Sequence, residues 1–260
     1  MLTIILIITF IASIAGSISG VGSGVIVKPV LDALCDYSSS TINLLSGTTV
    51  LAMTIASLIR SRSHSVKVDS SIGTPLAIGS AIGGILGKLL FSMVIAGSGN
   101  DQLVEIIQNL VLASLTLLVL LYLGFKARIR TIHINHKIGT VMIGLVLGVV
   151  SAFLGIGGGP INIIVLCFFF SMDSKSAALN SLYIILFSQV ASILFSLVTG
   201  SLPPLSWLLL EMIVCGVGGA LVGSIFTRKM THRAVDVVSI AMMAVVIGLS
   251  LFNAVKFLIQ

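Results

Sequence analysis

Apolar residues form eight long stretches of the chain, and charged residues are almost confined to the short segments between them. The stretches cover residues 2–27, 41–59, 72–96, 106–125, 138–172, 176–199, 205–227 and 237–255. A helix of about 20 consecutive apolar residues spans the hydrocarbon core of a bilayer. The pattern therefore predicts transmembrane helices in all of these stretches, and the first and fifth are too long for one ordinary helix.

A glycine cluster interrupts each of the two overlong stretches. The clusters are GVGSG at residues 20–24 and GIGGGP at residues 155–160. Successive glycines break a helix, and the freed backbone groups then need other partners inside a membrane. We therefore expect each overlong stretch to form a re-entrant hairpin or two short crossings.

The glycine clusters belong to an internal repeat. GVGSGVI aligns with GIGGGPI 135 residues later, TINLL around Asn43 aligns with ALNSL around Asn180, and GGILGKLL at Gly83 aligns with GALVGSIF at Gly219. The alignment predicts a first transmembrane repeat over residues 1–125 and a second over residues 137–260, joined by a basic cytoplasmic linker over residues 126–136. Each repeat would contain a glycine-broken first element followed by three transmembrane helices.

The positions of the basic residues indicate the orientation of the two repeats. Eleven of the 14 Lys and Arg residues fall in segments 60–67, 126–137 and 228–233 or at Lys175, and basic loops face the cytoplasm. Eight single crossings would place segment 228–233 opposite the other two. The conflict disappears if each glycine-broken stretch returns to the side it entered. The halves then have opposite orientations, the inverted-topology arrangement typical of secondary transporters.

Composition agrees with a membrane protein and excludes several other classes. Only 8% of the residues are charged, whereas a soluble domain carries roughly a quarter. The 6% aromatic content and 26 glycines favour packed helices over a β-barrel, so we predict an all-α polytopic fold. The net charge of +6 follows from the cytoplasmic loops and does not indicate nucleic acid. The cysteines and histidines lack ligand spacing, so we expect no metal, no cofactor and no enzymatic activity.

The glycine breaks are the candidate substrate site. Proline is favoured in the first turn of a helix, so a helix should begin at Pro160. Its free backbone N–H groups and positive dipole end would then bind a small anion. The candidate substrate-binding residues are Gly22, Ser23, Gly24, Gly157, Gly158, Gly159, Pro160, Asn162, Asn43 and Asn180. The alternative is that the glycines are hinges or helix contacts and that the asparagines join neighbouring helices.

Two ionisable residues are candidates for a coupling or charge role. Lys28 follows Gly24 by four residues and could place a positive charge beside the break, or it could extend to the outer interface. Glu211 follows Pro204 by seven residues, which is about 10 Å into the membrane at about 1.5 Å per residue. A carboxylate there is either a proton relay or a shallow structural group.

Both glycine motifs resemble those of the sulfite exporter TauE/SafE family, also called the toluene sulfonate uptake permease family. The similarity rests on GSISGVGSGVIVKPVL from Gly16 to Leu31 and on GVVSAFLGIGGGPINIIVL from Gly148 to Leu166. Ser23 stands where a glycine is usual in that family. The resemblance implies a multi-pass transporter of the cell membrane for small sulfur-containing anions, such as sulfite, thiosulfate or organosulfonates.

We therefore predict secondary transport of a small anion by alternating access, with sulfite, thiosulfate and sulfoacetate as representative substrates. A passive anion channel is the alternative. The choice of anion, import or export, a coupling ion (proton or sodium) and a homodimer are left open by the sequence.

Overall fold

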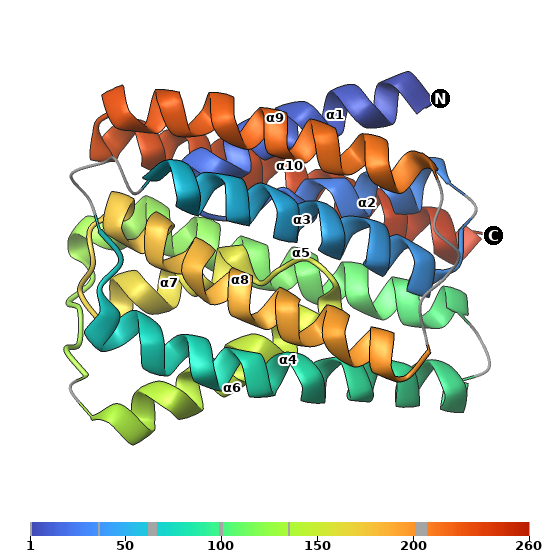
Figure 1. Cartoon of the computed structure of the whole chain (residues 1–260), viewed down its shortest axis with the longest axis horizontal. Coiled ribbons are helices and arrows are strands. Elements are labelled where there is room, and N and C mark those ends of the chain that lie inside the picture. Colours follow the sequence, from blue (N-terminus) through green and yellow to red (C-terminus); the bar gives the residue numbers. More distant parts are fainter. Residues whose placement is uncertain are drawn as a thin grey trace.

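The computed structural model of the chain describes residues 2–35, 37–61, 67–98, 101–134, 136–200 and 207–259. Over these residues the secondary structure consists of ten α-helices and one 3₁₀ turn, without any strand (Figure 1). Eight helices of this described part are long and apolar enough to cross a membrane. The predicted all-α, multi-pass fold class is confirmed.

The helices follow the same order in each half of the chain. The first half contains α1 (Leu2–Ser19), α2 (Gly24–Leu34), α3 (Ser39–Ser61), α4 (Ser70–Ser98) and α5 (Asp101–Phe125). After the turn η1 (Lys126–Arg128), the second half contains α6 (Lys137–Leu154), α7 (Gly159–Phe169), α8 (Ser174–Val198), α9 (Trp207–Lys229) and α10 (His232–Ile259). Helices α1 and α6 both have 18 residues, and α2 and α7 both have 11.

The two halves interlock, because the main helix contacts join one half to the other. Helix α4 packs on α6 as α9 packs on α1, and α4 packs on α8 as α9 packs on α3. Helices α5 and α10 also pack together. In Figure 1, α1 begins at the right-hand end of the bundle and α6 begins at the left-hand end. The helix directions agree with inverted repeats, and the orientation of the halves in a bilayer stays a prediction.

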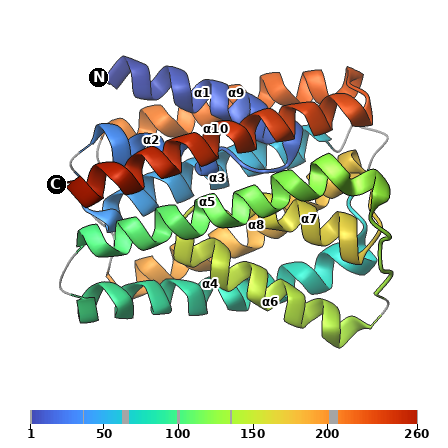
Figure 2. The ribbon, with the colours of Figure 1, turned by 180° about the vertical axis from the view of Figure 1, so that it is seen from behind.

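Both ends of the chain lie at the same end of the bundle, as Figure 2 shows. The opposite end holds the end of α5, the start of α8 and the start of α10, which are joined there by an ion pair between Lys126 and Asp236 and a hydrogen bond from Lys126 to Ser174. The turn η1, which begins the predicted basic linker, therefore lies at this opposite end.

Glycines allow the backbones of the central helices to touch. A Cβ atom at Gly83 of α4 would lie 2.1 Å from the Leu145 oxygen of α6, and one at Gly219 of α9 would lie 2.5 Å from the Phe10 oxygen of α1. Small residues allow this close approach between membrane helices. The aligned glycines of the two repeats thus make equivalent contacts.

Two helix boundaries differ from the apolar stretches. Helix α2 continues to Leu34 and includes Lys28 and Asp32, although the first apolar stretch ends at residue 27. Helix α5 begins at Asp101 and includes Glu105, although its apolar stretch begins at residue 106. The charged residues can belong to these helices because Lys28, Asp32 and Glu105 are all buried with polar partners.

Candidate functional site

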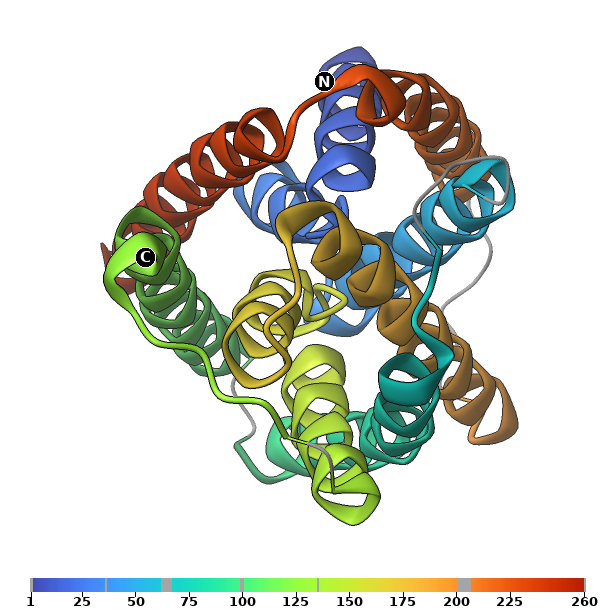
Figure 3. The ribbon, with the colours of Figure 1, turned by 90° about the vertical axis from the view of Figure 1, so that its left-hand side faces the viewer.

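The two glycine breaks meet in the interior of the bundle. A Cβ atom at Gly159 would lie 1.6 Å from the Val21 oxygen, and one at Gly24 would lie 2.9 Å from the Ile156 oxygen. All residues of segments 20–24 and 155–160 are buried. The end view in Figure 3 places α7 between α5, α6 and α8, helices that it contacts. The breaks are therefore in backbone contact across the boundary between the two halves.

The glycines are required by the backbone conformation at the breaks. The φ angles are 73° at Gly20 and 67° at Gly155, and 84° at Gly22 and 83° at Gly157. Side-chain-bearing residues rarely adopt this left-handed region. Because equivalent glycines share the same conformation, the repeat seen in the sequence is a repeat of the chain path as well.

The two breaks differ at the residue that precedes the short helix. Gly158, which precedes α7, has φ 73°, whereas Ser23, which precedes α2, has φ −73° in the right-handed region. A serine therefore fits at this position of the first break without strain. The departure of Ser23 from the glycine motif has a local structural reason.

Each break is followed by the start of a short helix. Helix α7 begins at Gly159 with Pro160 in its first turn, one residue before the start expected from the sequence, and α2 begins at Gly24. Ser23 makes no side-chain capping hydrogen bond, and Gly158 has no side chain with which to make one. The first N–H groups of a helix lack partners within it, and they carry its positive dipole end. Both helix starts therefore place backbone N–H donors and a positive dipole end in the interior of the molecule.

Polar side chains without hydrogen-bond partners surround the breaks. Both amide atoms of Asn43 are buried and unpartnered, as are the hydroxyl oxygens of Ser46 and Ser151. A Cβ atom at Gly155 would lie 2.0 Å from Asn43 Oδ1, and one at Gly24 would lie 3.0 Å from Ser46 Oγ. Each buried polar group without a partner costs about 1–3 kcal/mol. A small polar ligand at the breaks would supply these partners.

Other polar residues of both breaks also lie in this region. Asn162 is buried in the first turn of α7, and its Oδ1 is unpartnered. Ser23 has a buried hydroxyl without a partner. Gln189 of α8 lies between α3 and the second break, since its side chain would contact a Cβ atom at Gly47 of α3 or at Gly157 of the break. Sequence alone does not reveal this position of Gln189, because its approach to the second break depends on helix packing.

Asn180 and Glu211 lie elsewhere. Asn180 Oδ1 accepts a hydrogen bond from the backbone N–H of Asp69 at 3.1 Å, and its amide donates to the Ser176 oxygen at 2.9 Å. It therefore ties the start of α4 to α8. Glu211 is half-buried in the second turn of α9, and its Oε2 is buried without a partner. The contacts described for the breaks do not include either side chain.

Lys28 is buried and paired, so the interpretation that it extends to the outer interface is wrong. Only 2% of the residue is exposed. Its Nζ lies 3.3 Å from Asp32 Oδ2 and donates to Gln108 Oε1 at 3.0 Å. Asp32 and Gln108 were not among the residues predicted for the site. The spacing of Lys28 and Asp32, one helical turn apart, was the available signal, while Gln108 is 80 residues away.

Two cavities approach the breaks from opposite ends of the bundle. The first, here called the hydroxyl cavity, lies between the end of α3, the start of α8 and the end of α9 and is lined by Ser17, Ser57, Ser61, Lys175, Ala178, Leu179, Leu182, Ser224, Thr227 and Arg228. The second, here called the aromatic cavity, is lined by Ser40, Lys88, Phe91, Ser92, Ile95, Ala96, Phe195, Ser196 and Thr199.

Each cavity reaches a residue near one break. Ala178 of the hydroxyl cavity packs against Gly20, where a Cβ atom would lie 2.3 Å from Ala178 Cα. Phe91 of the aromatic cavity packs edge-on against Phe153, two residues before Gly155, with ring centroids 6.4 Å apart. Buried residues thus separate both cavities from the breaks.

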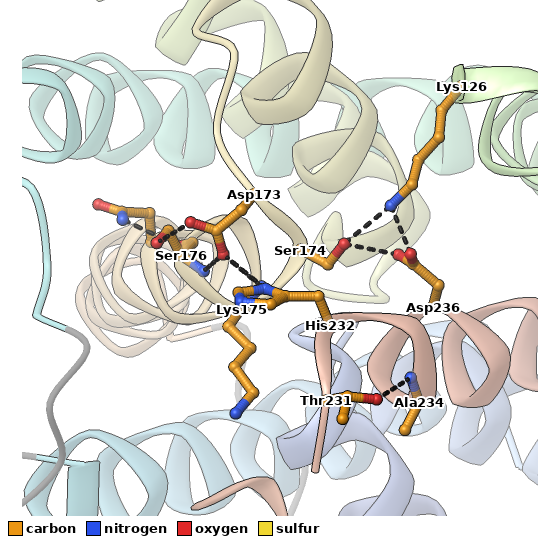
Figure 4. Close-up of polar contacts among 10 residues, drawn as sticks. Lys126, Asp173, Ser174, Lys175, Ser176, Thr231, His232, Ala234 and Asp236 are labelled. Atoms are coloured by element: carbon orange, nitrogen blue, oxygen red, sulfur yellow. Dashed lines mark hydrogen bonds and ion pairs between the residues drawn. The ribbon is translucent and has the colours of Figure 1, made fainter. Parts of the chain in front are cut away.

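Polar contacts brace the mouth of the hydroxyl cavity (Figure 4). Asp173 accepts hydrogen bonds from the backbone N–H groups of Lys175 and Ser176 at the start of α8, and it pairs with His232 of α10 at 3.0 Å. Lys126 bonds to Ser174 and to Asp236 of α10. In Figure 4 the side chain of Lys175 points away from these pairs, and it lines the cavity.

The charge of Asp173 is stabilised at this mouth. Partial burial acts to raise the pKa of its carboxyl group, but hydrogen bonds from Ser176, the nearby His232 and the Lys175 backbone outweigh it and hold the pKa below the ordinary value. Asp173 is therefore a charged N-cap, which also favours the start of α8.

Comparison with known proteins identifies the family. The family model described as "Sulfite exporter TauE/SafE" matches residues 5–251. The chain belongs to the TauE/SafE family. A relative from Bacillus subtilis (strain 168), "Probable membrane transporter protein YunE", is 25% identical over 262 residues, which cover 89% of this chain and 90% of the relative. No solved structure matches the chain. This TauE/SafE protein is thus a multi-pass membrane transporter, and the family match includes both glycine breaks.

Proposed function

We propose that this TauE/SafE protein is a secondary transporter that moves a small sulfur oxoanion or organosulfonate by alternating access. Sulfite, thiosulfate and sulfoacetate represent the substrate class. The observation that carries the proposal is the pair of helix starts, α2 and α7, buried beside unpartnered polar side chains and between two cavities. The description of the family as a sulfite exporter supports the choice of a sulfur oxoanion.

The breaks hold the anion mainly with uncharged donors. The backbone N–H groups of the first turns of α2 and α7 point toward the break, and the dipole ends add positive potential. The Asn43 amide and the hydroxyls of Ser46 and Ser151 have hydrogen-bonding capacity left over. Glycines let an oxoanion approach the backbone closely, because no side chain stands in the way.

The two cavities provide the two routes to this site. Lys175 and Arg228 at the hydroxyl cavity attract anions from one side of the membrane, because charges of one sign around a cleft raise the local concentration of the opposite ion. On the other side, the contact between Phe91 and Phe153 lies between the aromatic cavity and the second break. Opening one side at a time then gives alternating access.

The burial of the breaks favours a transporter over a passive channel. A conducting channel needs a continuous polar path, whereas Val21, Ser23 and Ile156 are all 0% exposed. The described residues therefore correspond to a closed arrangement in which transport requires a change of conformation.

Counterflow tests this function. Purified protein in liposomes loaded with unlabelled sulfite, thiosulfate or sulfoacetate should take up the labelled anion, and the uptake should saturate with concentration. Gly158→Leu should abolish counterflow, because a side chain at φ 73° is strained and its Cβ would lie 2.7 Å from Ser151 Cβ.

Gly248→Leu is the matched control. Gly248 lies on the exposed side of α10 with open space around it, so this variant should exchange anions at the wild-type rate. Both variants are compared at equal amounts of folded protein by size-exclusion chromatography. Counterflow by Gly158→Leu at the wild-type rate would refute the site, and unsaturable flux without counterflow would indicate the channel.

A further inference from the structure

A buried ion pair lies one helical turn beyond the first break. Lys28 and Asp32 of α2 are 2% and 3% exposed, and their charged groups are 3.3 Å apart. Lys28 follows Gly24 by four residues, which is about 6 Å along the helix at about 1.5 Å per residue. Charged groups at membrane depth are costly, and they usually mark an ion or proton pathway.

A single amide connects this ion pair to the second break. Gln108 of α5 accepts a hydrogen bond from Lys28 through Oε1 and donates one through Nε2 to the Phe153 oxygen. Phe153 lies in the last turn of α6, two residues before the second break begins at Gly155. The ion pair therefore contacts elements of both halves of the anion site.

The carboxylate of Asp32 is incompletely satisfied. Its Oδ2 bonds to Lys28 and accepts a hydrogen bond from Asn109 Nδ2 at 3.4 Å, while its Oδ1 is buried without a partner. Asn109 Oδ1 is also buried without a partner. A proton on Asp32 would give this group of acceptors the donor that it lacks.

The second half builds the same hairpin without charges. The positions equivalent to Lys28 and Asp32, 135 residues later, are Ile163 and Cys167 of α7, and both are buried in apolar surroundings. Apolar packing is thus sufficient for this element of the fold. Folding of the hairpin therefore does not by itself explain the ion pair of the first half.

We propose that Asp32 is the proton-binding site that couples anion transport to protons. In the closed arrangement Asp32 is the counter-anion of Lys28, and the pair is neutral. When Asp32 takes up a proton, its carboxylate becomes a neutral acid and Lys28 needs another negative charge. The substrate anion at the adjacent break supplies it, so one proton enters with each anion.

This coupling follows from charge balance in a medium of low dielectric. An uncompensated buried charge is strongly unfavourable, so the anion binds well only when Asp32 is protonated. By linkage, the proton then binds more tightly when the anion is present. The inference rests on the proposed function, since it assigns the coupling ion of the same site.

Other charged groups near α2 have partners of their own. Glu105 of α5 accepts a hydrogen bond from Ser39 Oγ at 2.6 Å, and Lys256 of α10 donates to the Ala33 oxygen at 3.0 Å. The other packed neighbours, α1 and α3, bring no charge to this region, since the described residues of α1 carry none and α3 carries only Arg60 near its far end. Glu105→Gln is therefore the matched control for Asp32→Asn.

The first measurement is anion binding at two pH values. Sulfoacetate binding to detergent-solubilised protein is followed by calorimetry at about pH 6 and about pH 8, where a dependence on one proton allows up to about a hundredfold difference in affinity. We expect the wild type and Glu105→Gln to bind more tightly at the lower pH. Asp32→Asn should bind equally at both. A pH dependence in Asp32→Asn equal to that of the wild type would overturn the proposal.

The second measurement is accumulation in liposomes. A gradient of about one pH unit, acidic outside, can drive about tenfold accumulation of the anion through one coupled proton. Whatever its counterflow rate, Asp32→Asn should not accumulate the anion. The double variant Lys28→Met/Asp32→Asn, which removes both charges, should not accumulate it either. The double variant provides the test if Asp32→Asn alone does not fold. Glu211→Gln should accumulate it normally. Loss in Glu211→Gln but not in either Asp32 variant would refute the proposal and assign coupling to α9. Accumulation driven by sodium instead of protons would also refute it.

Infrared spectroscopy tests the proton site without measuring transport, so its result is independent of the proposed function. Acidification of the wild type should produce a carboxylic-acid C=O band in infrared difference spectra that Lys28→Met/Asp32→Asn lacks. If none of the three sulfur anions shows counterflow, the proposed substrate class fails while this band still tests the proton site. Identical spectra for the wild type and the double variant would overturn the proton site.

Discussion

The two glycine-broken hairpins share their backbone and differ in their side chains. Gly20 and Gly22 have almost the same φ angles as Gly155 and Gly157, and α2 and α7 have the same length. Helix α2 nevertheless contains a buried ion pair where α7 has Ile163 and Cys167. The duplicated backbone is thus common to both halves of the proposed anion site, whereas the buried charges belong to one copy alone.

The largest expected effect comes from breaking the ion pair on one side. Lys28→Met should lower the free energy of unfolding by about 3–5 kcal/mol, because it leaves the Asp32 carboxylate buried without its counterion. Lys28→Met/Asp32→Asn should recover most of this loss and make α2 resemble α7. Thermal unfolding in detergent measures both variants. A double variant no more stable than the single one would show that α2 needs the pair for its fold.

A smaller effect is expected where the two breaks touch. Gly159→Ala should destabilise the protein by about 1–3 kcal/mol, since overpacking has this typical cost, and its Cβ would lie 1.6 Å from the backbone oxygen of Val21. The equivalent Gly24→Ala should cost less, because its closest contact is the side chain of Val50 at 2.6 Å. Unfolding temperatures of the two variants rank the sites. An equal fall in unfolding temperature in both variants would contradict this ranking and would mean that the backbone near Gly159 adjusts to a methyl group as easily as the Val50 side chain does.

The smallest expected effect concerns the helix that follows each hairpin. Helix α8 is capped by Asp173, which pairs with His232, whereas Ser38 offers its hydroxyl to the N–H of Thr41 at the start of α3. Asp173→Asn keeps a good N-cap and removes the exposed ion pair, which is worth about 0.2–1 kcal/mol.

The pH dependence of stability separates the charge of Asp173 from its role as the N-cap of α8. Its pKa in the folded protein is lowered, so its stabilisation is present above the pKa of the unfolded chain and is lost as the pH falls through the folded value. Unfolding temperatures measured from neutral pH into the acid range should fall less in Asp173→Asn than in the wild type. Parallel curves would contradict a contribution from the Asp173 charge.

Most of the helical framework could be predicted because it depends on local sequence. Long apolar runs specify membrane helices, and the glycine clusters specify breaks because few other residues adopt the φ angles at Gly22 and Gly157. The aligned motifs also identified Asn43, which the structure places against Gly155.

The polar partners could not be predicted, because they come together only through packing. Lys28 and Asp32 looked like the end of an apolar stretch, yet Gln108 and Asn109 from another helix allow them to be buried inside α2. Asn180 matched Asn43 in the alignment, but the start of α4 supplies the partner of its Oδ1. Symmetry of sequence therefore predicted the backbone better than the side-chain contacts.

The glycine faces of α4 against α6 and of α9 against α1 have a mechanical consequence. Where backbones touch at Gly83 and Gly219, no side chain of the glycine stands between the helices, so a small displacement of one helix along the other would need little repacking there. Shear motions in proteins are small displacements of this kind between packed helices. Both contacts join one half of the chain to the other, so we expect the two halves to move against each other along them.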